Sequence, residues 1–147
     1  MRKKLCVIAA VFGLSALAAP AALASSPHYT KGPTATLSGN SLVVSWKAAG
    51  LGNTSSVDFA LTGTVTATSQ CYTKSGNPVN GVPKTDTTNV DAGGTFPVRN
   101  GQTTGSISVS PLSTLTCTGK QHVFIQSVSY DLTLSGGGLP PVELTSP

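Results

Sequence analysis

The feature that most constrains the fold is the alternation of residue types between Val57 and Cys71. Apolar side chains occupy most positions of one alternate set, whereas Thr, Asp and Gln occupy the other. This period of two predicts an antiparallel β-strand with one buried face. Gly63 interrupts the apolar set, and a glycine there favours a bulge, or a bend at which a strand changes sheets.

From Thr34 onward, the rest of the sequence also predicts strands. It is rich in Thr, Ser and Val, and no window there has apolar residues at helical spacing with caps. We expect strands over 34–38, 41–48, 85–92, 95–98, 103–110 and 123–134. The dipeptides Gly39-Asn40 and Asn100-Gly101 predict hairpin turns of types II′ and I′, and Gly93-Gly94 predicts a further turn. Pro97 places its strand at a sheet edge. The aromatic residues expected to face inward are Trp46, Phe59, Phe96, Phe124 and Tyr130.

Seven or eight strands over residues 34–135 predict an all-β fold, a single antiparallel two-sheet sandwich of the immunoglobulin-like kind. Trp46 precedes both Cys71 and Cys117, so the Cys, Trp, Cys order of true immunoglobulin domains is absent. The pattern therefore predicts the architecture and not the family. We expect residues 25–33 to be flexible, and residues 136–147, which are rich in Gly and Pro, to form a disordered tail.

The first 24 residues have the features of a secretory signal peptide. A basic start at Arg2, Lys3 and Lys4 precedes an apolar run over 5–17, and Ala22-Leu23-Ala24 provides a cleavage site before Ser25. The apolar run is too short to span a membrane. We therefore expect a cleaved signal peptide over 1–24, no membrane span, and a secreted, extracellular product.

The net charge of +4 depends on this segment. Three of the nine basic residues are Arg2, Lys3 and Lys4, so six basic and five acidic residues remain after cleavage, and they are scattered along the chain. A basic stripe that could neutralise phosphates is absent from this pattern. The sequence predicts that neither nucleic acid nor an anionic membrane is a partner.

Cys71 and Cys117 remain after Cys6 is removed with the signal peptide. An even number of cysteines in an oxidising compartment predicts a disulfide. A metal or redox pair would favour C-x-x-C spacing or nearby histidines, and the sequence has neither. We therefore expect a structural bond between Cys71 and Cys117.

A set of motifs gives the chain a family resemblance. They are Gly50-Leu51-Gly52-Asn53 before a Thr-rich strand that ends in Cys71, a Gly/Asn/Pro loop, the run from Gly94 to Gly105, and Cys117 before a last strand. Together they resemble small exported proteins of actinobacteria, mostly known as hypothetical secreted proteins. The resemblance implies a secreted β-sandwich with one disulfide, and it assigns no functional residue.

Catalytic motifs are scarce in the sequence. There is no G-x-S-x-G motif, and the histidines are His28 and His122. A secreted hydrolase that uses His122 with a serine and with Asp58 or Asp131 is the weaker enzyme hypothesis, and carboxylates are too few for glycosidase chemistry. Oxygen ligands at Asp86, Asn89 and Asp91 suggest calcium only faintly, because Asp and Asn beside Gly are common in turns. We predict no catalytic residue, metal or cofactor.

The favoured function is that of a non-catalytic exported protein that contacts an unknown protein or a cell-envelope component. A polysaccharide-binding module is the alternative, which the inward phase of most aromatic residues disfavours. Functional contacts concentrate in loops on rigid scaffolds, and the Gly/Asn/Pro loop that follows Cys71 is the longest irregular stretch of the sequence. Its candidate binding residues are Tyr72, Lys74, Asn77, Asn80 and Lys84. The loop around Asn53 is the second choice.

Overall fold

The computed structural model describes residues 26–147. This part of the chain contains seven strands and no helix. The strands are β1 (His28–Ser38), β2 (Ser41–Ala49), β3 (Ser56–Tyr72), β4 (Lys84–Pro97), β5 (Thr103–Val109), β6 (His122–Gly136) and β7 (Leu139–Thr145). The predicted signal peptide and its cleavage site before Ser25 lie outside the described residues.

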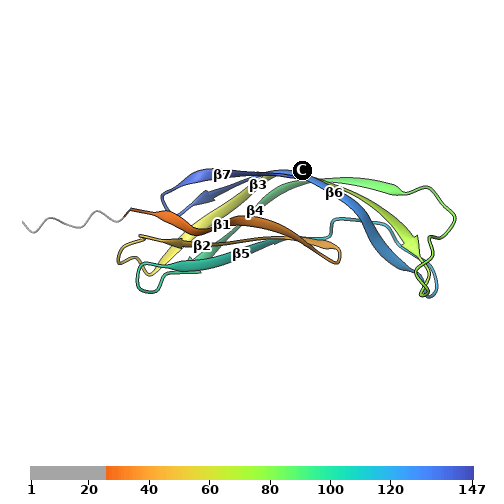
Figure 1. Cartoon of the computed structure of the whole chain (residues 1–147), viewed down its shortest axis with the longest axis horizontal. Helices are drawn as coiled ribbons and strands as arrows, with labels where there is room; N and C mark the ends of the chain where they lie inside the picture. The colour runs from red at the N-terminus through yellow and green to blue at the C-terminus, as the bar shows by residue number, and fades with distance from the viewer. Residues whose placement is uncertain (1–25) are drawn as a thin grey trace, which may run out of the picture.

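The strands form two antiparallel sheets, as the sequence predicts. A small sheet has the order β1-β2-β5, and a large sheet has the order β4-β3-β6-β7. Figure 1 shows the two sheets as stacked layers, with the long strands of the large sheet extending beyond the small sheet at one end. In the constant-type immunoglobulin arrangement the fourth strand joins the first two, whereas here β4 pairs with β3.

The core lies between the two sheets and follows the alternation of each strand. Trp46 is buried at its centre, with its ring centroid 4.8 Å from that of Phe59 and 5.1 Å from that of Phe96. The inward placement predicted for these three side chains is confirmed. Gly105 on β5 faces the indole so closely that a Cβ atom there would lie 2.4 Å from a ring carbon. A residue without a side chain is therefore needed opposite Trp46.

The prediction of unstructured ends is wrong. The segment predicted as the flexible N-terminus contains the first half of β1, in which Tyr29 pairs with Ala48. The predicted tail contains β7, which pairs with β6 and buries Leu139 and Leu144. The prolines that suggested disorder lie in an outermost strand, where a missing N–H group interrupts no ladder.

Of the turns and bends that were predicted from glycine residues, some are present in the structure and others are not. Asn100 and Gly101 both have positive φ angles, and Arg99 pairs with Gln102, as expected for a type I′ hairpin. The turn predicted at Gly93-Gly94 is wrong, because β4 runs without a break through both residues and pairs with β3 throughout. The register is also unbroken around Gly63, which pairs with Val90 on one side and Leu132 on the other, so β3 does not change sheets there.

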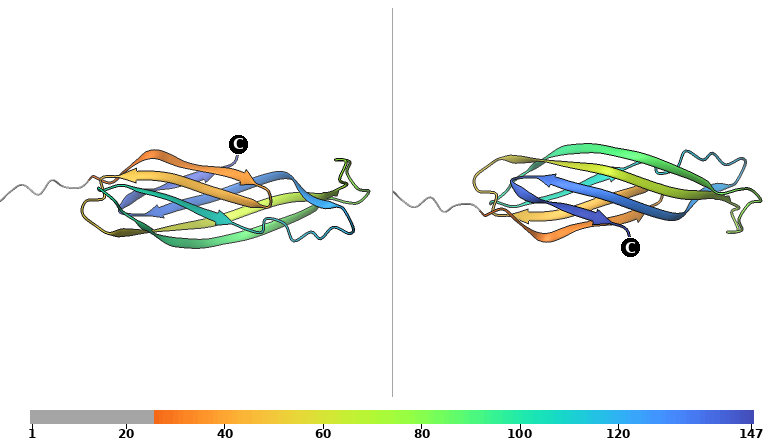
Figure 2. Two further views of the ribbon diagram at one scale, coloured as in Figure 1. Left: turned by 90° about the horizontal axis from the view of Figure 1, so that it is seen from below. Right: turned by 90° about the horizontal axis from the view of Figure 1, so that it is seen from above.

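The end at which the large sheet protrudes carries two long connections. Figure 2 shows residues 73–83, between β3 and β4, and residues 110–121, between β5 and β6, at this same end. The second connection crosses from the small sheet to the large sheet, and hydrogen bonds hold it to both sheets. Asn40 bonds it through Ser113, with Nδ2 donating to the Ser113 carbonyl at 3.1 Å and Oδ1 accepting from the Ser113 N–H at 2.9 Å.

Candidate functional site

The bond between Cys71 and Cys117 is present, and it defines what we call the disulfide end of the molecule. The Cα atoms of the two cysteines are 5.7 Å apart, within the usual range for this bond. The bond links the end of β3 to the 110–121 connection. The inner side of the large sheet is thus closed at this end, and the outer side, which faces away from the small sheet, remains open.

The candidate loop residues are spread over an ordered segment. Tyr72 is the last residue of β3, Lys84 is the first of β4, and the other three lie in the connection between them. The connection folds back on β3, because the Val79 N–H donates to the Cys71 carbonyl at 2.9 Å and Tyr72 forms a bridge with Pro78. It is therefore a compact flap, and the 110–121 connection is the longer irregular stretch.

Lys84 has a structural role within this set. Its ammonium group donates to the Thr114 hydroxyl and lies 3.5 Å from the Asp86 carboxylate. These two partners also bond each other, and their bonds hold the 110–121 connection against β4. The sequence analysis placed Lys84 and Tyr72 in one candidate site, but the two side chains contact different residues.

Phe124 was assigned to the wrong face by the sequence pattern. A register shift lies between the pairs Thr68/Ser127 and Ser69/Ile125, so Gln126 is an extra residue in β6. Such a bulge reverses the alternation on one side of it. Ile125 is consequently buried, and Phe124 faces outward with half of its side chain exposed.

The outward Phe124 joins Tyr72 in an aromatic pair. Their ring centroids are 5.1 Å apart and the ring planes are inclined by 55°. Tyr72 is half-buried, and both side chains project from neighbouring strands of the large sheet. Exposed contiguous apolar surface on a small protein often marks a binding site.

Two glutamines adjoin this aromatic pair, and we call them the amide pair. Gln126 Nε2 donates to Gln70 Oε1 at 2.7 Å and to the Tyr72 hydroxyl at 3.4 Å. Gln70 Nε2 in turn donates to the Val79 carbonyl at 3.1 Å. The flap, the amides and the rings are therefore one connected unit. A depression of about 160 Å³ beside it is lined by Gln70, Asn80, Val82 and Gln121, among others.

The hypothetical Ser/His/Asp site is not assembled by the fold. His122 pairs with Tyr72, whereas Asp131 pairs with Thr64, eight residues further along β3. At a rise of about 3.3 Å per residue, this separation is about 26 Å. Asp58 lies still further along the strand, where it accepts a hydrogen bond from Thr95. Neither carboxylate can orient the His122 ring.

The three residues with side-chain oxygens that suggested a calcium site, Asp86, Asn89 and Asp91, do not share one face of β4. Asn89 and Asp91 are exposed on the outer side of β4, whereas Asp86 lies in the opposite alternate set. Asp86 Oδ2 accepts the Thr114 N–H at 2.9 Å and Oδ1 accepts the Thr114 hydroxyl at 3.2 Å. Within residues 26–147, no three His, Cys, Asp or Glu residues are grouped as metal ligands.

The same hydrogen bonds lower the pKa of Asp86 below its ordinary value of 3.8, with the Thr114 N–H as the main cause and Lys84 as a smaller one. A lowered pKa contributes stability above the unfolded-state pKa, and this contribution disappears as the pH falls through the folded-state value. We expect Asp86→Asn to be less stable than wild type at pH 7. The difference in Tm should begin to shrink as the pH falls below about 4, and it should approach zero only when the pH is below the lowered pKa of folded Asp86.

Thermal unfolding of both proteins at several pH values measures this difference. The contributions of the other carboxyl groups to the pH dependence are common to both proteins and cancel. A difference in Tm that is the same at acidic and neutral pH would show that the Asp86 charge does not hold the connection.

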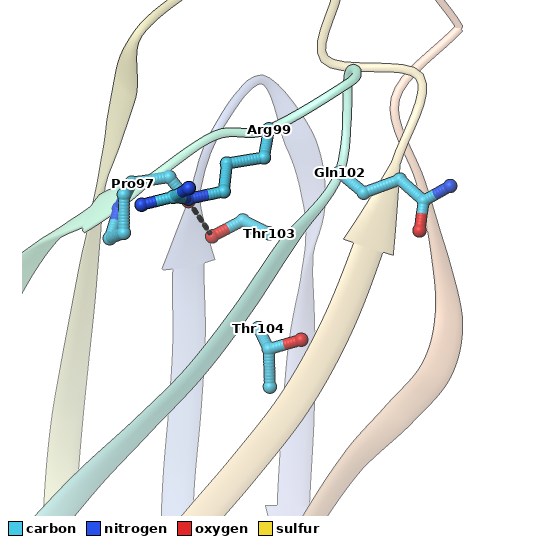
Figure 3. A pocket seen from close by; sticks show the side chains of 5 residues that line it. All are labelled: Pro97, Arg99, Gln102, Thr103 and Thr104. Carbon is cyan, nitrogen blue, oxygen red and sulfur yellow. Dashed lines mark hydrogen bonds between the residues drawn. The ribbon is translucent and has the colours of Figure 1, made fainter.

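A larger depression, of about 320 Å³, lies at the opposite end of the molecule. Figure 3 shows Arg99 reaching from its hairpin toward Pro97 and Thr103, with Gln102 turned away from them. The Thr103 hydroxyl already donates to the Pro97 carbonyl at 2.9 Å. One cation and few free polar groups make this a weaker candidate. The Asn53 loop lies nearby, because the Leu51 N–H donates to the Gly101 carbonyl at 3.0 Å.

Comparison with known proteins adds no assignment to these geometric findings. No protein-family model matches the sequence, and no curated protein matches it significantly. Across the described part of the chain, no helix has the length and apolar character needed to cross a membrane.

Proposed function

We propose that this chain is an exported, non-catalytic binding protein that contacts a component of the cell envelope through its disulfide end. The observation that carries the proposal is the outward aromatic pair, the half-buried Tyr72 and the exposed Phe124, which lies beside the disulfide, with Tyr72 bridged to Pro78 of the flap. A rigid base lowers the entropy that is lost when a partner binds. The expected signal peptide and the cysteine pair support action outside the cytoplasm.

Hydrolysis is the less favoured function. The one constellation that the sequence offers for it, His122 with Asp58 or Asp131, is spread along the large sheet. The disulfide end instead provides rings, amides and hydroxyl groups, which suit recognition. A binding role therefore uses the features that this surface has.

Two measurements test the proposal. We expect the protein in the culture medium or on the cell surface to begin at Ser25, as judged by intact mass. We also expect the mature protein to co-sediment with washed envelopes of the producing cells. The double variant Tyr72→Ala/Phe124→Ala should bind about 10-fold less or worse, because interface aromatics often contribute about 2 kcal/mol or more.

Leu37→Ala is the matched control, because Leu37 is an apolar residue, 45% exposed, on β1 of the small sheet, whereas the aromatic pair lies on the large sheet. It should bind as wild type does. Retention of Met1 in the mature product, or equal sedimentation of the double variant and wild type, would disprove the proposal.

A further inference from the structure

The aromatic pair and the amide pair combine two kinds of contact on one surface. An exposed aromatic ring can pack against the apolar C–H face of a sugar ring. The hydroxyl groups at the edge of the sugar then need donors and acceptors, and a glutamine amide provides both. Gln126 is exposed and uses its Nε2 in the bonds to Gln70 and Tyr72, so its Oε1 can accept from a ligand.

The surface beyond these four side chains is rich in hydroxyl groups, and Asp131 is a charged side chain at its far end. Thr66 bonds Thr87 at 3.0 Å and Thr68 bonds Thr85 at 3.1 Å, both across β3 and β4 on the outer side of the large sheet. On β6, Ser127 and Ser129 are exposed on the same side. Lys74 lies in the flap, and His122 is the cross-strand partner of Tyr72 at the start of β6. A surface that has a carboxylate and no cluster of cations matches an uncharged polymer better than an anionic one.

The hydroxyl-rich surface continues to a second depression. From Tyr72 back to Thr64, β3 spans about 26 Å at about 3.3 Å per residue. At the far end lies a depression of about 220 Å³, lined by Thr64, Thr66, Ser129, Asp131 and Ser146, among others. A strip of this length can contact several successive sugar units, each of which presents the same apolar faces and hydroxyl groups.

We propose that the outer face of the large sheet, from the aromatic pair to the depression beside Asp131, is a binding site for an uncharged polysaccharide. One sugar ring packs on Tyr72 and Phe124, and the amide pair bonds its hydroxyl groups. This inference rests on the proposed binding function and specifies its ligand class. The outward Phe124 is an exception to the inward phase of the aromatic residues, which disfavoured such a module in the sequence.

Affinity electrophoresis of the mature protein tests the site directly. The gels contain hydroxyethyl cellulose, laminarin, dextran or glycol chitin, with polygalacturonate as an anionic comparison. We expect retardation by at least one of the four uncharged polymers and none by polygalacturonate. Phe124→Ala should weaken the retardation about 10-fold or more, Gln126→Ala should weaken it less, and Phe124→Trp should preserve it.

Leu37→Ala is again the control, and an unchanged Tm establishes that each variant is folded. Absence of retardation by all four uncharged polymers, or equal retardation of wild type and Phe124→Ala, would overturn the inference. Protease treatment of the washed envelopes separates this outcome from failure of the proposed function. Phe124-dependent sedimentation that is lost after protease identifies a protein ligand, which contradicts the polysaccharide inference and leaves the binding function intact.

Discussion

Replacing both Cys71 and Cys117 with Ser is expected to lower the free energy of unfolding by about 4 kcal/mol. The bond closes a loop with a sequence separation of 46 residues. In the chain-entropy model, removing such a crosslink gives the unfolded chain more conformations. Small domains have a total stability of about 5–15 kcal/mol, so the variant loses a large share of it.

The folded state has other contacts that hold the same connection. Ser113 is buried and bonds both Asn40 and Ser69, and Thr114 bonds Asp86. We therefore expect the double variant to keep the fold and to unfold at a lower urea midpoint. The buried Trp46 provides the fluorescence signal.

Wild-type protein unfolded under reducing conditions should reproduce the midpoint of the double variant. Equal midpoints for the variant and oxidised wild type, or labelling of both cysteines in unreduced folded protein, would contradict the expected stabilisation.

The sequence predicted the strands that keep one phase of alternation along their length. β2 and β3 each have a mainly apolar and a mainly polar set of positions, so the burial of Trp46 and Phe59 followed directly from their phase. The disulfide was also predictable, because Cys71 and Cys117 are the cysteines left after the expected cleavage. These features depend on local pattern and on residue number, which a single sequence contains.

The candidate site was only partly predictable, because a bulge changes the phase within β6. Phe124 has the same parity as Leu132 and Leu134, so a constant alternation places it inward, whereas Gln126 shifts the register and turns it outward. A polar glutamine in an otherwise apolar set was the available signal. Tyr72 was among the candidates named from the sequence, but its neighbours Gln70 and Gln126 come from pairing between distant segments.

The strands at the two ends of the chain were missed for a different reason. β7 contains Pro140 and Pro141, which are unfavourable for a strand considered alone, and its stability comes from pairing with β6 and from burial of Leu139 and Leu144. Local propensity cannot reveal that an outer position in a sheet tolerates proline. Tertiary context also explains why β4 passes through Gly93 and Gly94, since β3 pairs with both.

Gly63 has a structural role, but this role differs from the one inferred from the sequence. The sequence marked this residue as a bulge or a sheet change, but β3 keeps its register with β4 and β6 on both sides of it. Its φ angle is +135°, and a Cβ atom would lie 2.1 Å from the Asp131 carbonyl oxygen. Glycine is thus required by the close approach of two central strands.

We expect Gly63→Ala to lower the free energy of unfolding by about 3–5 kcal/mol, combining an unfavourable backbone conformation with a clash against main-chain atoms. Because the clash involves backbone on β6, relief requires the two strands to separate. Gly32→Ala is the matched control, since Gly32 also lies in a strand and a Cβ atom added there would have no neighbour within 4 Å. Urea unfolding should leave this control near wild type, whereas Gly63→Ala should unfold at a much lower midpoint or fail to accumulate as folded protein. A Gly63→Ala midpoint equal to that of Gly32→Ala would disprove the requirement for close approach of β3 and β6.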